Sequence, residues 1–182
     1  MIIEDYANSS TVEVGGDRRL HTRSVSLDEA SHVSLQGDYF LVCNGAYHQS
    51  FGGWHLYLKN TSTSKNCFIQ VIQFAANQPG YFMLGHGGST VGNATAITPV
   101  NLNLGSAKVA PVEAYHGSSG SLTFGTAPTF FIGGIVNAYQ KHSEVFGGSL
   151  ILGVNNSISV MWDWSITAGV VAIGIQFYFK DI

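Results

Sequence analysis

The clearest alternation of hydrophobic and polar positions lies in the last part of the chain. One segment has apolar residues at Ile158, Val160, Trp162 and Trp164. A second has them at Val171, Ile173, Ile175, Phe177 and Phe179. Alternation at every second residue is typical of a strand with one face in the core. We therefore predict two antiparallel strands, with the two tryptophans in the core rather than on a carbohydrate-binding surface.

The same period of two appears in shorter segments from residue 38 onwards. Trp54, Leu56 and Leu58, for example, share one face of a predicted strand. Turns rich in glycine and asparagine separate these segments. About eight short strands with almost no helix are typical of a sandwich or jelly roll. The sequence predicts an all-β fold, an antiparallel β-sandwich of jelly-roll type, over residues 37–182.

The segment from Cys67 to Phe74 departs from simple alternation because it is apolar on both faces. Phe68, Ile72 and Phe74 lie on one predicted face, and the alternate positions from Cys67 lie on the other. A strand with two apolar faces is buried on both. The second sheet covers one face, and a neighbouring subunit is a candidate for the other. We therefore predict Phe68, Ile72 and Phe74 in an oligomer or capsid interface.

Residues 1–36 differ from the rest and are predicted to form an N-terminal arm. Their weak alternation of polar and apolar positions indicates an extended or edge-hairpin structure. Ser26 and Glu29 have the spacing of a capping box, so one short helix is expected over residues 27–35, ending at Gly37. Arg18, Arg19 and Arg23 form the single basic cluster and are the arm's predicted contact residues.

Composition changes this picture by pointing to contacts with other molecules. Hydrophobic residues make up 45% of the 182 residues and charged residues only 10%, against about 25% charged in an average soluble domain. A surface with so few charges is either neutral and polar or buried against partners. The net charge of −3 disfavours nucleic-acid binding. The longest apolar stretch, residues 169–175, is too short to span a bilayer, and no secretory signal is predicted.

No catalytic or cofactor site is predicted. The seven histidines do not have the spacings usual for a metal site, although a metal on an oligomer axis stays open because one histidine per subunit would suffice. The loop from Gly85 to Gly88 lacks the nucleophile motif that an esterase would add. Cys43 and Cys67 are expected to be buried free thiols rather than a disulfide. We predict no enzyme activity, no cofactor and no metal.

Several segments together resemble a known family. They are the arm segment 16–26, the strand and connection 56–62, the segment 67–72, and the turn-rich segments 98–106 and 147–157. In this order they are similar to the jelly-roll structural proteins of tailed-bacteriophage virions, some of which are capsid decoration, or cement, proteins. The resemblance covers most of the chain through strand and turn patterns.

This resemblance implies a virion structural protein made in the host cytoplasm, with the capsid exterior as the favoured location. It implies a homo-oligomer, expected to be a trimer, that binds the major capsid protein or another virion protein. On this hypothesis the arm's arginines pair with acidic groups on the shell.

Two rival hypotheses stay open at this point. One is a tail or fibre adhesin, or a lectin-like module, that binds host surface glycans through loops bearing Phe51, Trp54 and His86. The other is a metal-dependent jelly-roll enzyme.

Overall fold

The structure is a computed structural model of the chain. It describes the backbone of residues 2–5, 10–14, 20–24, 29–44, 47–49, 54–91, 94–118, 123–126, 128–163 and 169–181. Side chains are described for residues 31–44, 54–88, 94–117, 128–163 and 169–181. Within the described part of the chain, no helix is long and apolar enough to cross a membrane.

The described elements are one helix and a series of strands. The helix is α1 (Glu29–Leu35). The strands that precede or follow it in the first half are β1 (Ile2–Asp5), β2 (Ser10–Val14), β3 (Leu20–Ser24), β4 (Tyr39–Cys43), β5 (Tyr47–Gln49), β6 (Trp54–Asn60), β7 (Lys65–Ala76), β8 (Gly80–His86) and β9 (Ser89–Val91). Those in the second half are β10 (Thr95–Ala96), β11 (Val100–Asn101), β12 (Val112–Ser118), β13 (Thr123–Thr126), β14 (Thr129–Val136), β15 (Lys141–Leu152), β16 (Ser157–Asp163) and β17 (Gly169–Asp181).

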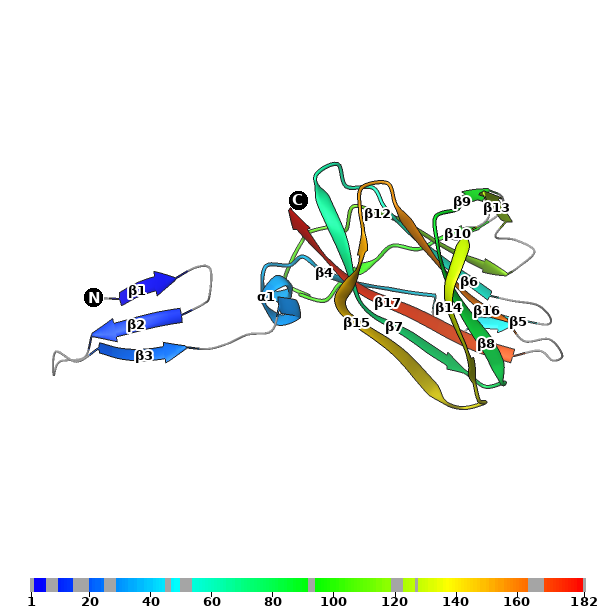
Figure 1. Cartoon of the computed structure of the whole chain (residues 1–182), viewed down its shortest axis with the longest axis horizontal. Coiled ribbons are helices and arrows are strands. Elements are labelled where there is room, and N and C mark those ends of the chain that lie inside the picture. The colour runs from blue at the N-terminus through cyan, green and yellow to red at the C-terminus, as the bar shows by residue number, and fades with distance from the viewer. Residues whose placement is uncertain are drawn as a thin grey trace.

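Two large antiparallel sheets form the body of the molecule (Figure 1). The first sheet has the strand order β10-β12-β6-β16-β8-β14. The second has the order β11-β4-β17-β7-β15, with β5 also paired to β17. We call these the β16 sheet and the β17 sheet after their central strands. The prediction of an all-β antiparallel sandwich is confirmed.

The connections between the long strands give the sandwich a jelly-roll topology. The first long strand, β4, pairs with the last, β17, and the second, β6, pairs with the second-last, β16. Strands β7 and β8 then add β15 and β14 at the outer edges. This nested pairing of strands far apart in sequence defines a jelly roll. Residues between β8 and β14 are an insertion, from which β12 extends the β16 sheet beyond β6.

The core lies between the two sheets and contains the residues that alternation predicts. Ile158, Val160 and Trp162 of β16 are fully buried, as are the alternate apolar residues of β17 from Val171 to Phe177. The ring of Phe74 lies 4.6 Å from that of Phe82 and 6.2 Å from that of Trp162, which joins the two sheets. The core position of Trp162 is confirmed, whereas Trp164 lies outside the described residues.

A β-bulge in β7 explains why this segment is apolar on both faces. Val71 pairs with Gln176 and Ile69 pairs with Phe177, so Gln70 has no opposite residue on β17. An extra residue of this kind reverses which side chains face inward. Cys67 and Ile69 face the core before the bulge, and Ile72 and Phe74 face it afterwards. The prediction that Ile72 and Phe74 lie in an interface is therefore wrong, because both are fully buried within one chain.

The arm forms a three-stranded antiparallel sheet, β1-β2-β3, which lies apart from the sandwich, beyond α1 (Figure 1). The predicted helix is present at Glu29–Leu35. It ends as expected at Gly37, which has a φ of 76°. The Gly37 amide donates to the Ser34 carbonyl at 3.0 Å and the Asp38 amide to the Val33 carbonyl at 2.9 Å, which is a Schellman cap.

One side of the sandwich is closed by a short crossing segment. Thr95 and Ala96 pair with β12 in the β16 sheet, and Val100 and Asn101 pair with β4 in the β17 sheet. Residues 95–101 therefore connect the two sheets at this side, and we call this segment the strap. The opposite side carries the edge strands β14 and β15, which end their sheets and do not pair with each other.

Candidate interaction surfaces

The outer face of the β17 sheet presents a neutral surface, as the strand register shows. Its side chains lie in three rows that cross the sheet. The rows are Tyr39, Tyr178, Phe68 and Ile151; Val100, Leu41, Gln176, Val71 and Val145; and Cys43, Gly174, Gln73 and Ser143. None of these residues is charged. We call this surface the neutral face.

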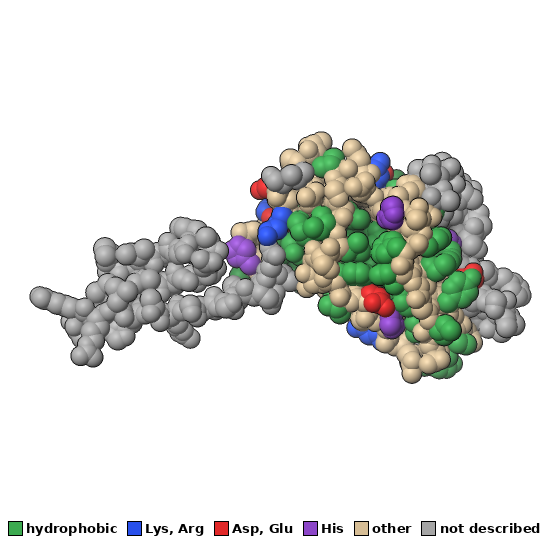
Figure 2. All heavy atoms as spheres, viewed as in Figure 1, with side chains coloured by type: hydrophobic (Ala, Val, Ile, Leu, Met, Phe, Trp, Pro, Cys, Tyr) green, Lys and Arg blue, Asp and Glu red, His purple; other side chains and the backbone are tan. Residues whose placement is uncertain are grey.

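Charged residues lie only at the margins of the neutral face among the described positions of its strands. Lys141 and Lys180 are at strand ends. Several face residues are exposed, with Val145 at 71%, Val100 at 55% and Ile151 at 48%. A solvated face of an antiparallel sheet usually carries polar and charged residues. In Figure 2 hydrophobic and neutral side chains likewise cover most of the visible surface of the sandwich, and charged groups are few.

An aromatic cluster stabilises one end of the neutral face. The rings of Phe68 and Tyr178 are stacked at 5.2 Å with an interplanar angle of 7°, and Tyr39 meets Tyr178 edge-on at 6.4 Å. The Tyr39 hydroxyl donates to Gln176 Oε1 at 2.9 Å. Offset aromatic pairs are favourable beyond their buried area. The residues at this end of the face therefore pack against one another within one chain.

The two edge strands carry features that discourage pairing with a further strand. In β15 the register shifts between Val145 and Leu150, and Gly147 and Gly148 have positive φ values of 57° and 81°. In β14 it shifts between Phe130 and Ile132. Bulges of this kind distort an edge, and inward-pointing charges have the same effect. Contacts through a face are thus better supported than contacts along an edge.

The inward-pointing polar groups form one histidine–carboxylate pair on β15. His142 Nε2 lies 2.7 Å from Glu144 Oε1, and both side chains are about one-third exposed. The imidazole ring lies 5.0 Å from the ring of Phe82. The pair therefore occupies the open side of the sandwich, between the two sheets.

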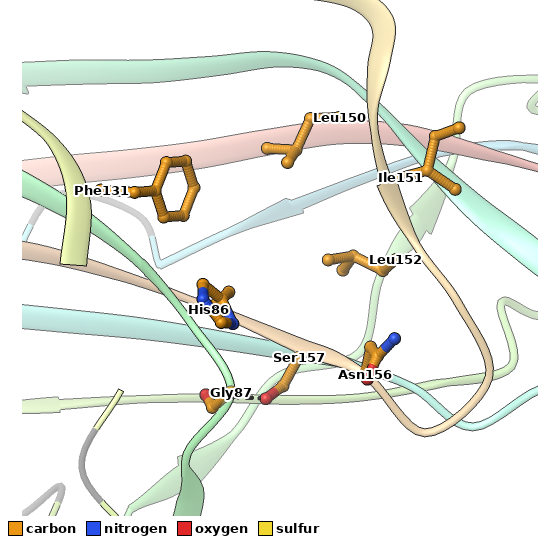
Figure 3. Close-up of a pocket in the computed structure, with 8 residues that line it drawn as sticks. All are labelled: His86, Gly87, Phe131, Leu150, Ile151, Leu152, Asn156 and Ser157. Atoms are coloured by element: carbon orange, nitrogen blue, oxygen red, sulfur yellow. Dashed lines mark hydrogen bonds between the residues drawn. The ribbon is translucent and has the colours of Figure 1, made fainter. Parts of the chain in front are cut away.

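A pocket of about 400 Å³ opens at this side, where β14 and β15 diverge. Phe131 of β14 and Leu150, Ile151 and Leu152 of β15 form its apolar walls (Figure 3). Its polar end contains His86, Gly87, Asn156 and Ser157. The Ser157 hydroxyl donates to the Gly87 carbonyl at 2.9 Å. The pocket thus combines apolar walls with a few hydrogen-bonding groups, as small-ligand and side-chain pockets do.

Two further groups of exposed hydrophobic residues lie outside the neutral face. Ile135 and Tyr139 are 83% and 84% exposed and lie near the β14–β15 turn, where Tyr81 is 41% exposed. Leu35, Leu104 and Val109, which are 70–87% exposed, lie near the end of α1. The Asn103 side chain ties these last two segments together by donating to the Leu35 carbonyl at 3.2 Å.

The predicted contact residues have different outcomes. Arg18, Arg19 and Phe51 lie outside the described residues, and only the backbone of Arg23 is described, within β3. Phe68 does lie on the neutral face, whereas Ile72 and Phe74 do not. Trp54 is buried at 3% exposure, so its predicted role as a surface aromatic is wrong. His86 is exposed and lines the pocket.

Trp54 is buried because the inner face of β6 packs into the core near the end of the sandwich. Its ring lies 5.4 Å from that of His116 on the neighbouring strand β12. The opposite face of β6 is also covered, since Tyr57 is only 2% exposed. Neither face of β6 therefore offers a surface-binding site at Trp54 or Tyr57.

The cysteines and histidines were placed partly as expected. Neither cysteine is in a disulfide, and burial raises the pKa of the Cys67 thiol. Cys43 is exposed, contrary to prediction, because it faces outward in the third row of the neutral face. Burial lowers the pKa of His55 to about 4, partly offset by the Asp163 carboxylate, and burial also lowers the pKa of His116. Among the described residues, no group of three or more possible metal ligands occurs.

Tyr139 and the pocket were missed at the level of the sequence. The pocket residues come from four segments that only the fold brings together. Tyr139 follows Asn137 and Ala138, which look like an ordinary turn, and nothing in the local pattern marks its left-handed backbone.

Comparison with known proteins gave no matching family model, no matching curated protein and no matching solved structure.

Proposed function

We propose that this chain is a phage virion structural protein, most directly a capsid decoration protein that binds the assembled shell as an oligomer and stabilises it. The observation that carries the proposal is the neutral face. Side chains that avoid charge over five neighbouring strands suit a permanent contact, because charged residues are depleted at the centres of protein interfaces. The sequence resemblance to phage jelly-roll proteins is the reason for proposing a virion protein as the partner.

The dimensions of the neutral face suit such a contact. Three rows about 7 Å apart, on five strands about 4.8 Å apart, give roughly 500 Å². A standard stable interface buries about 800 Å² on each partner. The face therefore supplies most of the required area, and we assign it to the major capsid protein or another protein of the shell.

The arm supplies the remaining contacts in this proposal. Its three-stranded sheet lies apart from the sandwich, where it can reach a neighbouring capsomer (Figure 1). Arg18, Arg19 and Arg23 would pair there with carboxylates of an acidic shell. Because the protein would bind only the assembled shell, mass action would stabilise that state against disassembly.

The test is binding to phage particles stripped of the protein, followed by heating. Wild-type protein is expected to sediment with stripped particles and to raise the temperature at which they release DNA. Unchanged DNA release with and without bound protein would overturn the proposal.

A single near-isosteric substitution tests the face itself. Gln73→Glu places a charge in the third row of the neutral face, and its burial on binding should weaken shell binding at least ~10-fold. Gln78→Glu makes the same change in the loop after β7, outside the face, and should alter binding less than about twofold. Equal effects of the two substitutions would show that the face is not the contact.

A further inference from the structure

Tyr139 combines a strained backbone conformation with an exposed side chain. It lies in the turn between β14 and β15 with a φ of 59°. A bulky side chain rarely adopts this left-handed conformation, because its Cβ crowds the following carbonyl. The Tyr139 amide donates to the Ala76 carbonyl at 2.8 Å, which fixes the turn against β7. Its side chain is nevertheless 84% exposed. Strain at an exposed aromatic residue points to a role outside the chain.

The pocket at the other end of β14 and β15 has the shape and chemistry to receive such a side chain. Its walls at Phe131, Leu150 and Leu152 suit the apolar faces of an aromatic ring (Figure 3). At its polar end, the Ser157 hydroxyl donates its hydrogen bond to the Gly87 carbonyl. The Ser157 oxygen therefore keeps a lone pair that accepts a hydrogen bond. A phenol, with a ring and a hydroxyl donor at its tip, fits both features.

We propose that Tyr139 of one copy inserts into the pocket of a second copy and joins the copies head to tail. Insertion within one chain is excluded, because the twelve residues of β15 separate the two ends by roughly 35 Å. The contact deepens the proposed virion role, since its biological purpose rests on assembly of the decoration protein.

The area around both partners supports a second copy as the occupant. One aromatic side chain buries about 150–250 Å², well below the ~800 Å² per partner of a standard interface. Ile135 and Tyr81 extend the apolar surface beside Tyr139, and Phe130 extends it beside the pocket. Tyr139 is thus the anchor of a larger contact. A head-to-tail contact either closes into a ring or continues as a filament, and the expected trimer is a closed ring.

Light scattering of two Tyr139 variants tests the contact without confusing it with misfolding. Tyr139→Gly removes the side chain and also relieves the backbone strain. It should therefore be monomeric at concentrations where wild type is oligomeric, while its thermal midpoint stays the same or rises relative to dissociated wild type. Tyr139→Phe keeps the ring but loses the hydroxyl, and should weaken association about 5- to 10-fold. A Tyr139→Gly variant with the wild-type mass would overturn the proposal.

Mixing two defective variants tests the head-to-tail geometry. Phe131→Asp places a charge at the pocket mouth and should also be monomeric. The Phe131→Asp variant keeps an intact Tyr139, and the Tyr139→Gly variant keeps an intact pocket. A mixture of the two should therefore give a heterodimer and nothing larger. Two variants that stay monomeric when mixed would overturn head-to-tail insertion.

Shell binding separates this inference from the proposed function. Tyr139→Gly monomers that still sediment with stripped particles would support a shell contact through the neutral face and a separate contact between copies. If wild type forms the Tyr139-dependent oligomer but does not bind particles, the virion role fails and the contact between copies stands. A wild-type protein that is monomeric at all concentrations would overturn the contact.

Discussion

At the residue scale, one inserted position decides which side chains of β7 enter the core. Gln70 has no opposite residue on β17, and the strand therefore changes its inward set from Cys67 and Ile69 to Ile72 and Phe74. The same insertion turns Val71 outward, onto the neutral face. The two neighbours Val71 and Ile72 thus have opposite environments although both are β-branched and apolar.

The bulge predicts different costs for truncating these two neighbours. Ile72→Ala should lower the free energy of unfolding by about 2–5 kcal/mol, because it leaves a cavity in the core. Val71→Ala should cost less than about 1 kcal/mol in the separated chain, because Val71 contacts solvent. Urea denaturation of both variants measures the difference. A larger loss for Val71→Ala would place the bulge elsewhere.

His55 predicts a loss of stability in acid. Burial lowers its pKa to about 4 in the folded chain, against ~6.5 when unfolded. Between these values the unfolded chain binds the extra proton, so this contribution is present above pH 6.5 and is lost as the pH falls towards 4. Between about pH 7.5 and about pH 4.5 the loss should be about 2–3 kcal/mol. It is measured by urea denaturation at about pH 7.5 and about pH 4.5.

His55→Gln serves as the reference for that measurement, because glutamine does not titrate. The difference in unfolding free energy between wild type and His55→Gln should shift by about the same amount between the two pH values. An unchanged difference would mean that His55 is not buried as a neutral group. His116, whose pKa burial also lowers, contributes in the same direction to both proteins and cancels.

The sequence predicts residue environments well wherever alternation is unbroken and poorly where it is not. Ile158, Val160 and Trp162 follow a regular strand, and their burial agrees with their pattern. The burial of Ile72 and Phe74 does not agree with the predicted pattern. The bulge that reverses them is a single inserted residue, and Gln70 looks in the sequence like any polar strand residue. Trp54 was misplaced for a different reason, because it was assigned to the loop before β6, whereas it is the first residue of that strand and lies on the core face with Leu56 and Leu58.

At the element scale, the bulge in β15 is shaped by the aromatic cluster beneath it. Gly147 and Gly148 both have positive φ values, but only one is confined. A Cβ on Gly148 would lie 2.5 Å from the Tyr178 hydroxyl oxygen, whereas a Cβ on Gly147 would meet nothing within 4 Å. Tyr178 in turn stacks on Phe68. The close approach of Gly148 therefore links an edge strand to the aromatic end of the neutral face.

These adjacent glycines form a matched pair for a prediction. Gly147→Ala should cost about 1 kcal/mol of stability, from backbone strain alone. Gly148→Ala carries the same strain and must also displace Tyr178, so its cost should exceed that of Gly147→Ala by about 1 kcal/mol or more. Thermal unfolding followed by tyrosine near-ultraviolet circular dichroism measures both effects. Equal losses of stability in the two variants would show that the Tyr178 side chain moves aside without cost.

Helix α1 shows what local sequence determines at this scale. The stop at Gly37 was predicted, because a Schellman cap depends only on neighbouring residues. Which strands pair was not predictable in the same way. The pairing of β4 with β17 joins residues more than a hundred positions apart, and no local pattern carries that information.

At the scale of the whole molecule, the two long sides of the sandwich are not equivalent. On one side the strap of residues 95–101 pairs with both sheets, and the Ile97 amide donates to the Ala114 carbonyl at 2.9 Å. On the other side β14 and β15 belong to different sheets and enclose the pocket and the His142–Glu144 pair. Tyr139 and the pocket, the two halves of the proposed contact between copies, both lie on this open side.

The strap joins the two sheets along one side of the sandwich, so the sheets can separate more easily at the opposite side. Any partial separation of the two sheets should begin at β14 and β15, which belong to different sheets and do not pair with each other, and should stop at β4, β6 and β12. Native-state hydrogen exchange reports this order directly. Amides of β14 should exchange through openings of low free energy, and those of β17 only through global unfolding. If the protein assembles on a particle as proposed, contacts at the open side would hold β14 and β15 in place. Amide hydrogen exchange should then slow most in β14.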